Sequence, residues 1–134
     1  MIDLHLHFDG SLLPRTVLEL ADEQGIRLPA REPDELKLFL TAPADCASLN
    51  EYLEKFDLPL LVLQTKEAIR KGMYTLASSL REQGMLYAEI RFAPQLHTRK
   101  GLTQEQVVKA ALLGLQEALA GSFFKAKLIL CCMR

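Results

Sequence analysis

Three short apolar segments in this chain are separated by stretches long enough to hold helices. They span residues 2–9, 85–92 and 127–133, and each has the length and composition of a β-strand. Helical patterns fill the intervals, so hairpins cannot join consecutive strands. Because parallel strands require such long crossover connections, the order predicts an α/β fold with a parallel sheet.

The intervening segments show helix periodicity with start and stop signals. Helices are predicted over residues 14–24, 34–40, from 49 to a break at 59, 66–83 and 104–120. Ser48 with Glu51, and Thr103 with Gln106, have the spacing of capping boxes. Gly84 follows the longest pattern as a C-terminal stop. These signals predict the helix boundaries independently of the strands.

A sheet of three strands with helices on one side would have two open edges, whereas a (β/α)8 barrel takes roughly 250 residues. The chain therefore predicts the first three strands and intervening helices of a (β/α)8 TIM-type barrel. Residues 1–134 are expected to form the N-terminal part of one barrel domain, with the remainder absent from this chain. Functional groups of such barrels lie at the carboxyl ends of strands. His7, Asp9, Pro94 and Met133 fall at or just past predicted strand ends.

The first strand carries two histidines and a carboxylate at alternating positions. Strict alternation from Ile2 would place His5, His7 and Asp9 on one face and the apolar residues on the other. Neutral imidazole is the commonest protein ligand for metals, zinc included. This spacing favours a metal site over an edge strand with solvated histidines. Asp9 before Gly10 could equally be a turn residue.

Three further polar residues near the second strand are predicted to be structural. Alternation would turn Glu89 and Arg91 inward with the histidines, where pairing with each other is expected rather than a direct catalytic role. His97, after Pro94, is predicted to be a surface loop histidine.

Composition excludes several classes of function. The chain has 134 residues, 49% of them hydrophobic, and a net charge of -1. Without a basic stripe, nucleic acid is not expected as a partner. No apolar run approaches the ~20 residues of a membrane span, and no secretory signal pattern opens the chain. Three cysteines, at positions 46, 131 and 132, do not form a disulfide framework, so a cytoplasmic location is expected.

Several motifs together resemble the adenosine deaminase family. The chain opens with His5-Leu6-His7-Phe8-Asp9-Gly10-Ser11-Leu12, continues with Leu53-Glu54-Lys55-Phe56-Asp57 and Tyr87-Ala88-Glu89-Ile90-Arg91-Phe92-Ala93-Pro94, and ends with Ile129-Leu130-Cys131-Cys132-Met133-Arg134. The first and last of these motifs are the specific ones. The resemblance spans the chain in order and at similar spacing, and implies a barrel enzyme that hydrolytically deaminates adenosine with zinc.

The resemblance also implies roles for individual residues. His5 and His7 match zinc-binding histidines, of which His7 also lies against the substrate, and Asp9 matches the aspartate that binds the ribose 5′-hydroxyl. Leu96 and Met133 match residues that line the substrate pocket of the family. An apolar lid over that pocket is matched by Leu49, Tyr52, Leu53 and Phe56. The family often has phenylalanine at the position of Tyr52. By its spacing alone, this lid stripe would be interpreted as core.

The remaining zinc ligands and the catalytic glutamate and histidine of the family match nothing within this chain. The expected partners are therefore a small purine nucleoside and the missing C-terminal part of the barrel, which could be a separate chain. Alone, the 134-residue piece is predicted to be inactive. The alternatives are a deaminase of adenine or another purine derivative, which tends to carry glutamate at the position of Asp9, and an inert truncated fragment.

Overall fold

The computed structural model describes residues 1–41 and 57–132, and contains a three-stranded parallel sheet in the order β1-β2-β3. The strands are β1 (Ile2–His7), β2 (Tyr87–Phe92) and β3 (Lys125–Leu130). The predicted parallel sheet is confirmed. The third strand differs from the predicted range 127–133, because it begins two residues earlier, at Lys125, and ends three residues earlier, at Leu130. Pairing explains this, since β2 supplies partners from Tyr87, opposite Lys125, to Phe92, opposite Leu130.

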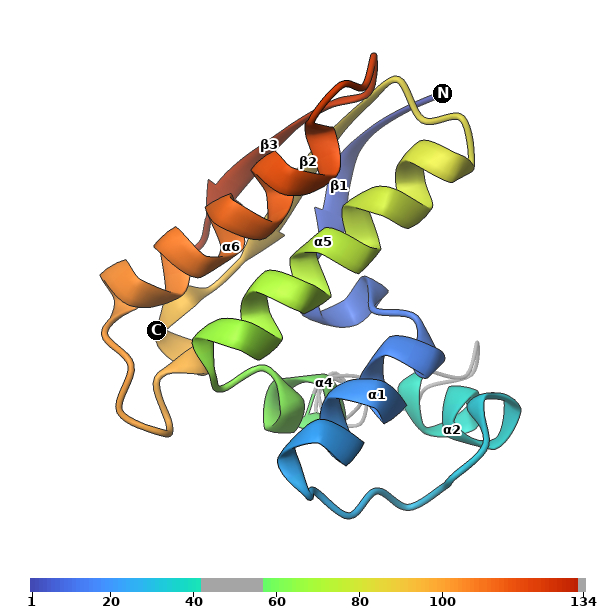
Figure 1. The fold of residues 1–134 in the computed structure, drawn as a ribbon, viewed down its shortest axis with the longest axis vertical. Coiled ribbons are helices and arrows are strands. Elements are labelled where there is room, and N and C mark those ends of the chain that lie inside the picture. The colour runs from blue at the N-terminus through green and yellow to red at the C-terminus, as the bar shows by residue number, and fades with distance from the viewer. Residues whose placement is uncertain (42–56, 133–134) are drawn as a thin grey trace.

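The helices lie in two groups around this sheet. The longer pair, α5 (Lys66–Glu82) and α6 (Gln104–Leu119), lies side by side over one face of the sheet (Figure 1). The shorter helices α1 (Pro14–Gln24), α2 (Pro33–Leu40) and α4 (Asp57–Val62) gather beyond the carboxyl end of β1 (Figure 1). Single 3-10 turns, η1 (Asp9–Ser11) and η2 (Pro94–His97), follow β1 and β2 directly. The face of the sheet opposite α5 and α6 carries no described helix.

The local signals place the ends of α1, α2, α5 and α6 to within one residue. The break predicted at residue 59 is wrong, because Pro59 lies in the first turn of α4, where a missing amide proton costs no helix hydrogen bond. The side chain of Thr103 accepts a hydrogen bond from the Gln106 amide, and the Gln106 Oε1 accepts one from the Thr103 amide, which completes the predicted capping box. Thr65 caps α5 through the Ala68 amide. Gly25 ends α1 with φ of 65°, a left-handed conformation that glycine adopts without strain. The helix start predicted at Ser48 lies outside the described residues.

The core forms between α5, α6 and one face of the sheet. Ala88, Ile90 and Phe92 alternate along β2 and are buried against the helices, while Tyr87, Glu89 and Arg91 are half-buried on the opposite face. The backbones of α5 and α6 approach closely at Gly114, where an added Cβ would lie 2.1 Å from the Arg70 carbonyl oxygen. This contact fixes the helix pair over the sheet and leaves the other face of the sheet available for function.

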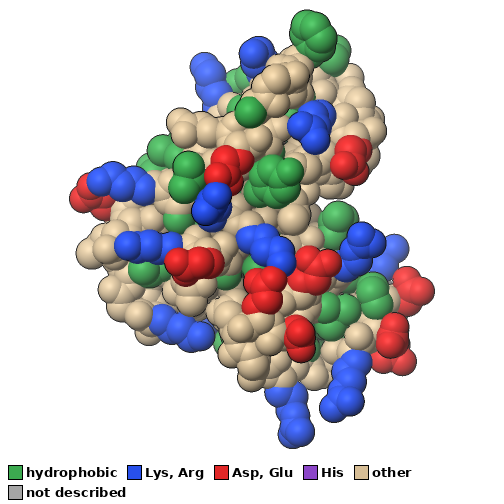
Figure 2. Space-filling model, viewed as in Figure 1, with side chains coloured by type: hydrophobic (Ala, Val, Ile, Leu, Met, Phe, Trp, Pro, Cys, Tyr) green, Lys and Arg blue, Asp and Glu red, His purple; other side chains and the backbone are tan. Residues whose placement is uncertain are grey.

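The outer surface of the helices shows no concentration of one charge. Lysine and arginine side chains alternate with aspartates and glutamates across the face seen in Figure 2. Cross-helix ion pairs join Arg70 to Glu117, and Lys71 to Glu19 and Glu23. These exposed pairs contribute little each to stability.

Candidate functional site

The rings of His5 and His7 meet on the face of the sheet opposite α5 and α6. His7 pairs with Arg91, which lies on that face, and the His5 and His7 ring centroids are 5.3 Å apart. Their Nε2 atoms approach to 3.3 Å. Two imidazoles thus present the same nitrogen to one point, at the carboxyl end of β1.

This separation fits two nitrogens that bind one metal ion. Zinc–nitrogen bonds of about 2.0–2.1 Å at a tetrahedral angle place two ligand nitrogens about 3.3–3.4 Å apart. Neutral imidazole offers one lone pair per ring, so two such nitrogens at this spacing suit zinc. Among residues 1–41 and 57–132, no group of three or more histidine, cysteine, aspartate or glutamate side chains could hold a metal ion. The two histidine nitrogens could therefore fill two positions of a four-ligand shell.

A β-bulge in β1 sets the direction of His5. Asp3 pairs with Ala88 and Leu6 with Ile90, so β1 uses three residue steps where β2 uses two. The extra residue breaks the strict alternation predicted from Ile2. Ile2 and Leu4, predicted to face the helices, are instead 63% and 56% exposed. Asp3 supports the bulge, since its Oδ1 accepts a hydrogen bond of 2.9 Å from the His5 amide.

Asp9 is buried at the turn that follows β1. Its side chain is 7% exposed, and its Oδ1 accepts a hydrogen bond of 3.0 Å from the Gly10 amide. Among the described residues, no hydrogen bond reaches its other oxygen, Oδ2. The carboxylate thus supports the turn with one oxygen and has acceptor capacity left on the second.

Glu89 and Arg91 do not pair with each other, in contrast to the prediction. Glu89 accepts a hydrogen bond of 3.0 Å from the Tyr87 hydroxyl, which raises the pKa of Tyr87. Arg91 donates from Nη2 to the Leu4 carbonyl oxygen at 2.9 Å, within the bulge. The bulge exposes a carbonyl that the alternation pattern could not reveal, and Arg91 binds it.

His97 is fully buried, so its prediction as a surface loop residue was wrong. Its Nδ1 lies 2.9 Å from the Leu63 carbonyl oxygen, and because a carbonyl only accepts, Nδ1 carries the proton. The ring stacks on Phe8 and meets the edge of Phe92. Burial lowers the pKa of His97, while the Leu63 bond and the Asp9 carboxylate oppose that effect. The environment of His97 therefore favours its neutral form, and its ring packs on Phe8, the residue before Asp9.

Leu96 is the remaining described candidate, half-buried within η2. Gln64, which no sequence pattern singles out, donates from Nε2 to the Leu96 carbonyl oxygen at 2.9 Å. The other predicted substrate-lining residues lie outside the described residues, namely Leu49, Tyr52, Leu53, Phe56 and Met133. The structure thus brings His5, His7, Asp9 and Leu96 to the carboxyl ends of two neighbouring strands.

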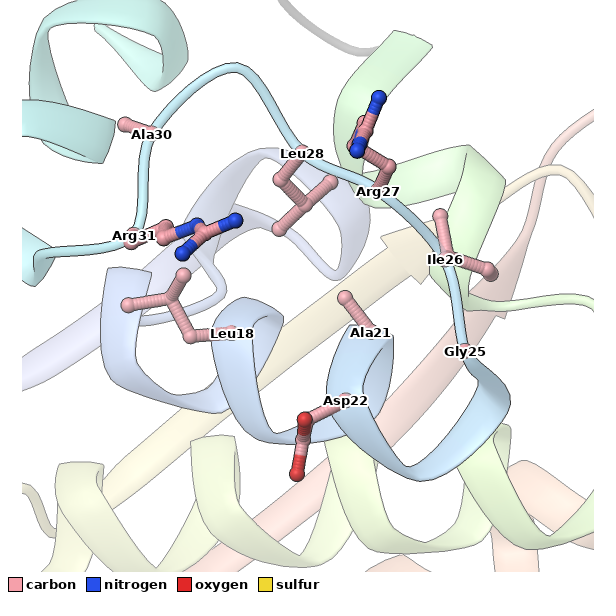
Figure 3. A pocket seen from close by; sticks show the side chains of 9 residues that line it. All are labelled: Leu18, Ala21, Asp22, Gly25, Ile26, Arg27, Leu28, Ala30 and Arg31. Atoms are coloured by element: carbon pink, nitrogen blue, oxygen red, sulfur yellow. The ribbon is translucent and has the colours of Figure 1, made fainter.

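A pocket of about 550 Å³ lies elsewhere, between α1 and the connection that follows it (Figure 3). Leu18 and Ala21 line the pocket from α1, and Arg27 and Arg31 line it from the connection. None of the residues that line this pocket is a candidate ligand or substrate contact. The chemistry of this part of the chain therefore belongs to the strand ends.

Comparison with known proteins decides the family. The family model described as adenosine deaminase matches residues 1–134. Over 135 aligned residues, the adenosine deaminase of Haemophilus ducreyi is 55% identical and covers 100% of this chain. The adenosine deaminase of Enterococcus faecalis is 43% identical and covers 99% of it.

The chain belongs to the adenosine deaminase family. It spans about two fifths of the length of these curated relatives, 39% of each. Among solved structures, the adenine deaminase from Arthrobacter aurescens matches 96% of this chain with a TM-score of 0.80 and 27% identity, and the chain covers 38% of that structure. An amidohydrolase with bound zinc from Burkholderia matches with a TM-score of 0.73 at 18% identity, over 96% of this chain and 34% of that one.

These matches confirm the predicted fold, the first three strands and intervening helices of a (β/α)8 barrel. Among the helices that the structure describes, none combines the length and apolar character that a membrane crossing needs.

Proposed function

We propose that this chain supplies the first strands of a zinc-dependent enzyme that converts adenosine and deoxyadenosine to inosine or deoxyinosine and ammonia. One observation carries the proposal: the 3.3 Å approach of the His5 and His7 Nε2 atoms at a barrel strand end. Membership of the adenosine deaminase family supplies the reaction. The two histidines hold zinc from one side, and the other ligands and the catalytic groups come from outside this chain.

Zinc bound there would supply the Lewis-acid chemistry that makes water nucleophilic near neutral pH. The residues of this chain perform the binding. Asp9 accepts a hydrogen bond from the ribose 5′-hydroxyl through its available oxygen. Leu96 and Met133 line the purine site, and Leu49, Tyr52, Leu53 and Phe56 cover it as an apolar lid. His7 contacts both the metal and the substrate.

Deamination of adenine or another purine derivative is the alternative. The solved adenine deaminase from Arthrobacter aurescens shares this fold, which supports that reaction class. Asp9 favours a nucleoside, because adenine deaminases tend to carry glutamate at this position. Relatives named adenosine deaminase are also more similar in sequence, at up to 55% identity.

We place the protein in the cytoplasm. Cys131 and Cys132 are free thiols in the structure, and a reducing compartment would keep them so.

The test is turnover by the complete enzyme with zinc. Adenosine should yield inosine and ammonia, and a chelator should suppress the reaction until zinc is restored. His5→Ala and His7→Ala should each abolish zinc retention as well as turnover. Residues 1–134 alone should bind zinc weakly and remain inactive, since catalytic zinc takes about three protein ligands. A zinc-loaded complete enzyme that turns over adenine but neither adenosine nor deoxyadenosine would establish the alternative instead.

A further inference from the structure

Two buried polar side chains join the connection between α4 and α5 to η2. Gln64 is 2% exposed and His97 is fully buried. Gln64 donates from Nε2 to the Leu96 carbonyl oxygen at 2.9 Å, and its Oε1 accepts from the Arg99 amide at 2.9 Å. His97 returns a bond of 2.9 Å from Nδ1 to the Leu63 carbonyl oxygen. We call these three reciprocal bonds the Gln64–His97 clasp.

The amide of Gln64 is fully used in this arrangement. Its Nε2 also donates to the Leu60 carbonyl oxygen at 2.8 Å, which anchors the clasp to α4. A side chain of the same shape without the amide would leave the Leu96 carbonyl and the Arg99 amide unpaired. Both bonds are partly buried, and backbone groups shielded from water are costly to leave unpaired, so η2 would have to shift to find other partners.

His97 carries the clasp to the end of β1. Its ring stacks on Phe8 with centroids 6.1 Å apart and an interplanar angle of 24°. It also meets the edge of the ring of Phe92, the last residue of β2, with a distance of 5.5 Å between the ring centroids. Phe8 stands between His7 and Asp9 in the chain. A displacement of His97 is therefore transmitted to the turn that presents the Asp9 carboxylate.

We propose that Gln64 and His97 are positioning residues, whose clasp holds Leu96 and the Phe8–Asp9 turn in the geometry that binds the purine nucleoside. This inference rests on the proposed function. The histidine pair is held separately: His7 is fixed by strand pairing with Arg91, and His5 by the Asp3 bond within β1. Loosening the clasp should therefore weaken substrate binding more than it slows hydrolysis.

The test compares two glutamines in the complete enzyme. Gln64→Met removes the clasp bonds while keeping the side-chain shape. Gln24→Met is the matched control. Gln24 Nε2 also donates to two carbonyl oxygens, those of Leu20 and Val62, each at 2.8 Å. Neither Leu20 nor Val62 lies in η2. We expect the KM for adenosine to rise about fivefold or more in Gln64→Met with kcat within about twofold, and the KM of Gln24→Met to stay unchanged.

Two His97 variants test the same inference if Gln64→Met fails to fold. His97→Phe fills the ring volume without a donor and should raise KM. His97→Asn keeps a donor near the Nδ1 position but loses the ring that stacks on Phe8, so its KM should rise as well. Hydrogen exchange of the Arg99 amide should accelerate in Gln64→Met and stay unchanged in Gln24→Met.

Three results would overturn the inference: an unchanged KM in folded Gln64→Met or His97→Phe, an equal KM rise in Gln24→Met, or a kcat loss without a KM change. Lack of turnover of adenosine and deoxyadenosine by the unmodified enzyme is a different outcome. That outcome would contradict the proposed function, and the role of the clasp in nucleoside binding with it, at any hydrogen-exchange rate of the Arg99 amide.

Discussion

The guanidinium of Arg91 donates a hydrogen bond of 2.9 Å from Nη2 to the carbonyl oxygen of Leu4. Leu4 precedes His5 in the bulge of β1, and Arg91 is also the pairing partner of His7 at the end of that strand. One residue of β2 therefore supports β1 at both histidines, by its side chain at the bulge and by strand pairing at His7. The distance between the two Nε2 atoms depends on this support.

Replacement of Arg91 should weaken zinc binding by the complete enzyme. Arg91→Met removes the bond to Leu4 and frees the bulge, so we expect zinc affinity to fall about tenfold, the scale at which groups that orient metal ligands act. A competition titration with a chromophoric chelator measures the change. Arg70→Met is the control, because it removes an arginine that pairs with Glu117 on the outer helix surface. Equal zinc affinity in the two variants would contradict the role of Arg91.

Replacement of Gly114 should destabilise the packing of α5 on α6. The new Cβ of Gly114→Ala would meet the Arg70 carbonyl oxygen at 2.1 Å and its carbon at 2.9 Å, so the helix backbones must separate. Alanine gains about 1 kcal/mol of helix propensity over glycine, yet overpacking costs typically 1–3 kcal/mol, and here a backbone must move. We expect the free energy of unfolding to fall by about 2 kcal/mol.

Gly72→Ala is the matched control for that measurement. Its Cβ would meet Leu63 Cδ2 at 3.0 Å, so the end of one side chain, and no backbone, would have to give by a few tenths of an ångström. Denaturant unfolding should therefore show a clearly smaller loss than for Gly114→Ala. Equal stability of Gly114→Ala and the unmodified protein would mean that the close helix approach does not limit residue size.

The buried His97 should make stability depend on pH. Burial is the main cause of its lowered pKa, so the unfolded chain takes up a proton at a higher pH than the folded chain does. Between the lowered folded pKa and the ordinary value of about 6.5, the unfolded state holds more protons, and stability rises with pH. On acidification, stability due to His97 should therefore be lost as pH falls below about 6.5.

His97→Phe isolates the contribution of His97 from that of all other groups. The difference in unfolding free energy between the variant and the unmodified protein should change across that acidic window and stay constant above it. A difference that is independent of pH would contradict the lowered pKa.

The helix boundaries were predictable because their signals are local. Thr103 and Gln106 satisfy each other's amides within one turn, and Gly25 ends α1 by its own backbone freedom. The parallel sheet followed from the lengths of the connections between the strands. None of these requires knowledge of a distant partner.

The errors concern features that tertiary pairing creates. The bulge in β1 arises only against β2, so strict alternation misplaced Ile2 and Leu4 and hid the carbonyl that Arg91 binds. His97 looked like a loop residue because it follows Pro94, whereas Phe8, which stacks on its ring, follows β1 and is far away in the sequence. Gln64 has no sequence signal at all, since its partners are backbone groups.

Replacement of Asp9 should separate its role in the turn from its role in binding. In the proposed function its carboxylate accepts a hydrogen bond from the ribose 5′-hydroxyl, and a bond to a charged acceptor contributes roughly 1.5–3 kcal/mol. Asp9→Ala should therefore weaken adenosine binding about tenfold or more and affect 5′-deoxyadenosine much less. Asp9→Asn keeps an oxygen for the Gly10 amide and removes the charge, so it should show most of the same nucleoside discrimination with little loss of stability. Measured affinities that fall equally for both nucleosides would show that Asp9 serves only the turn.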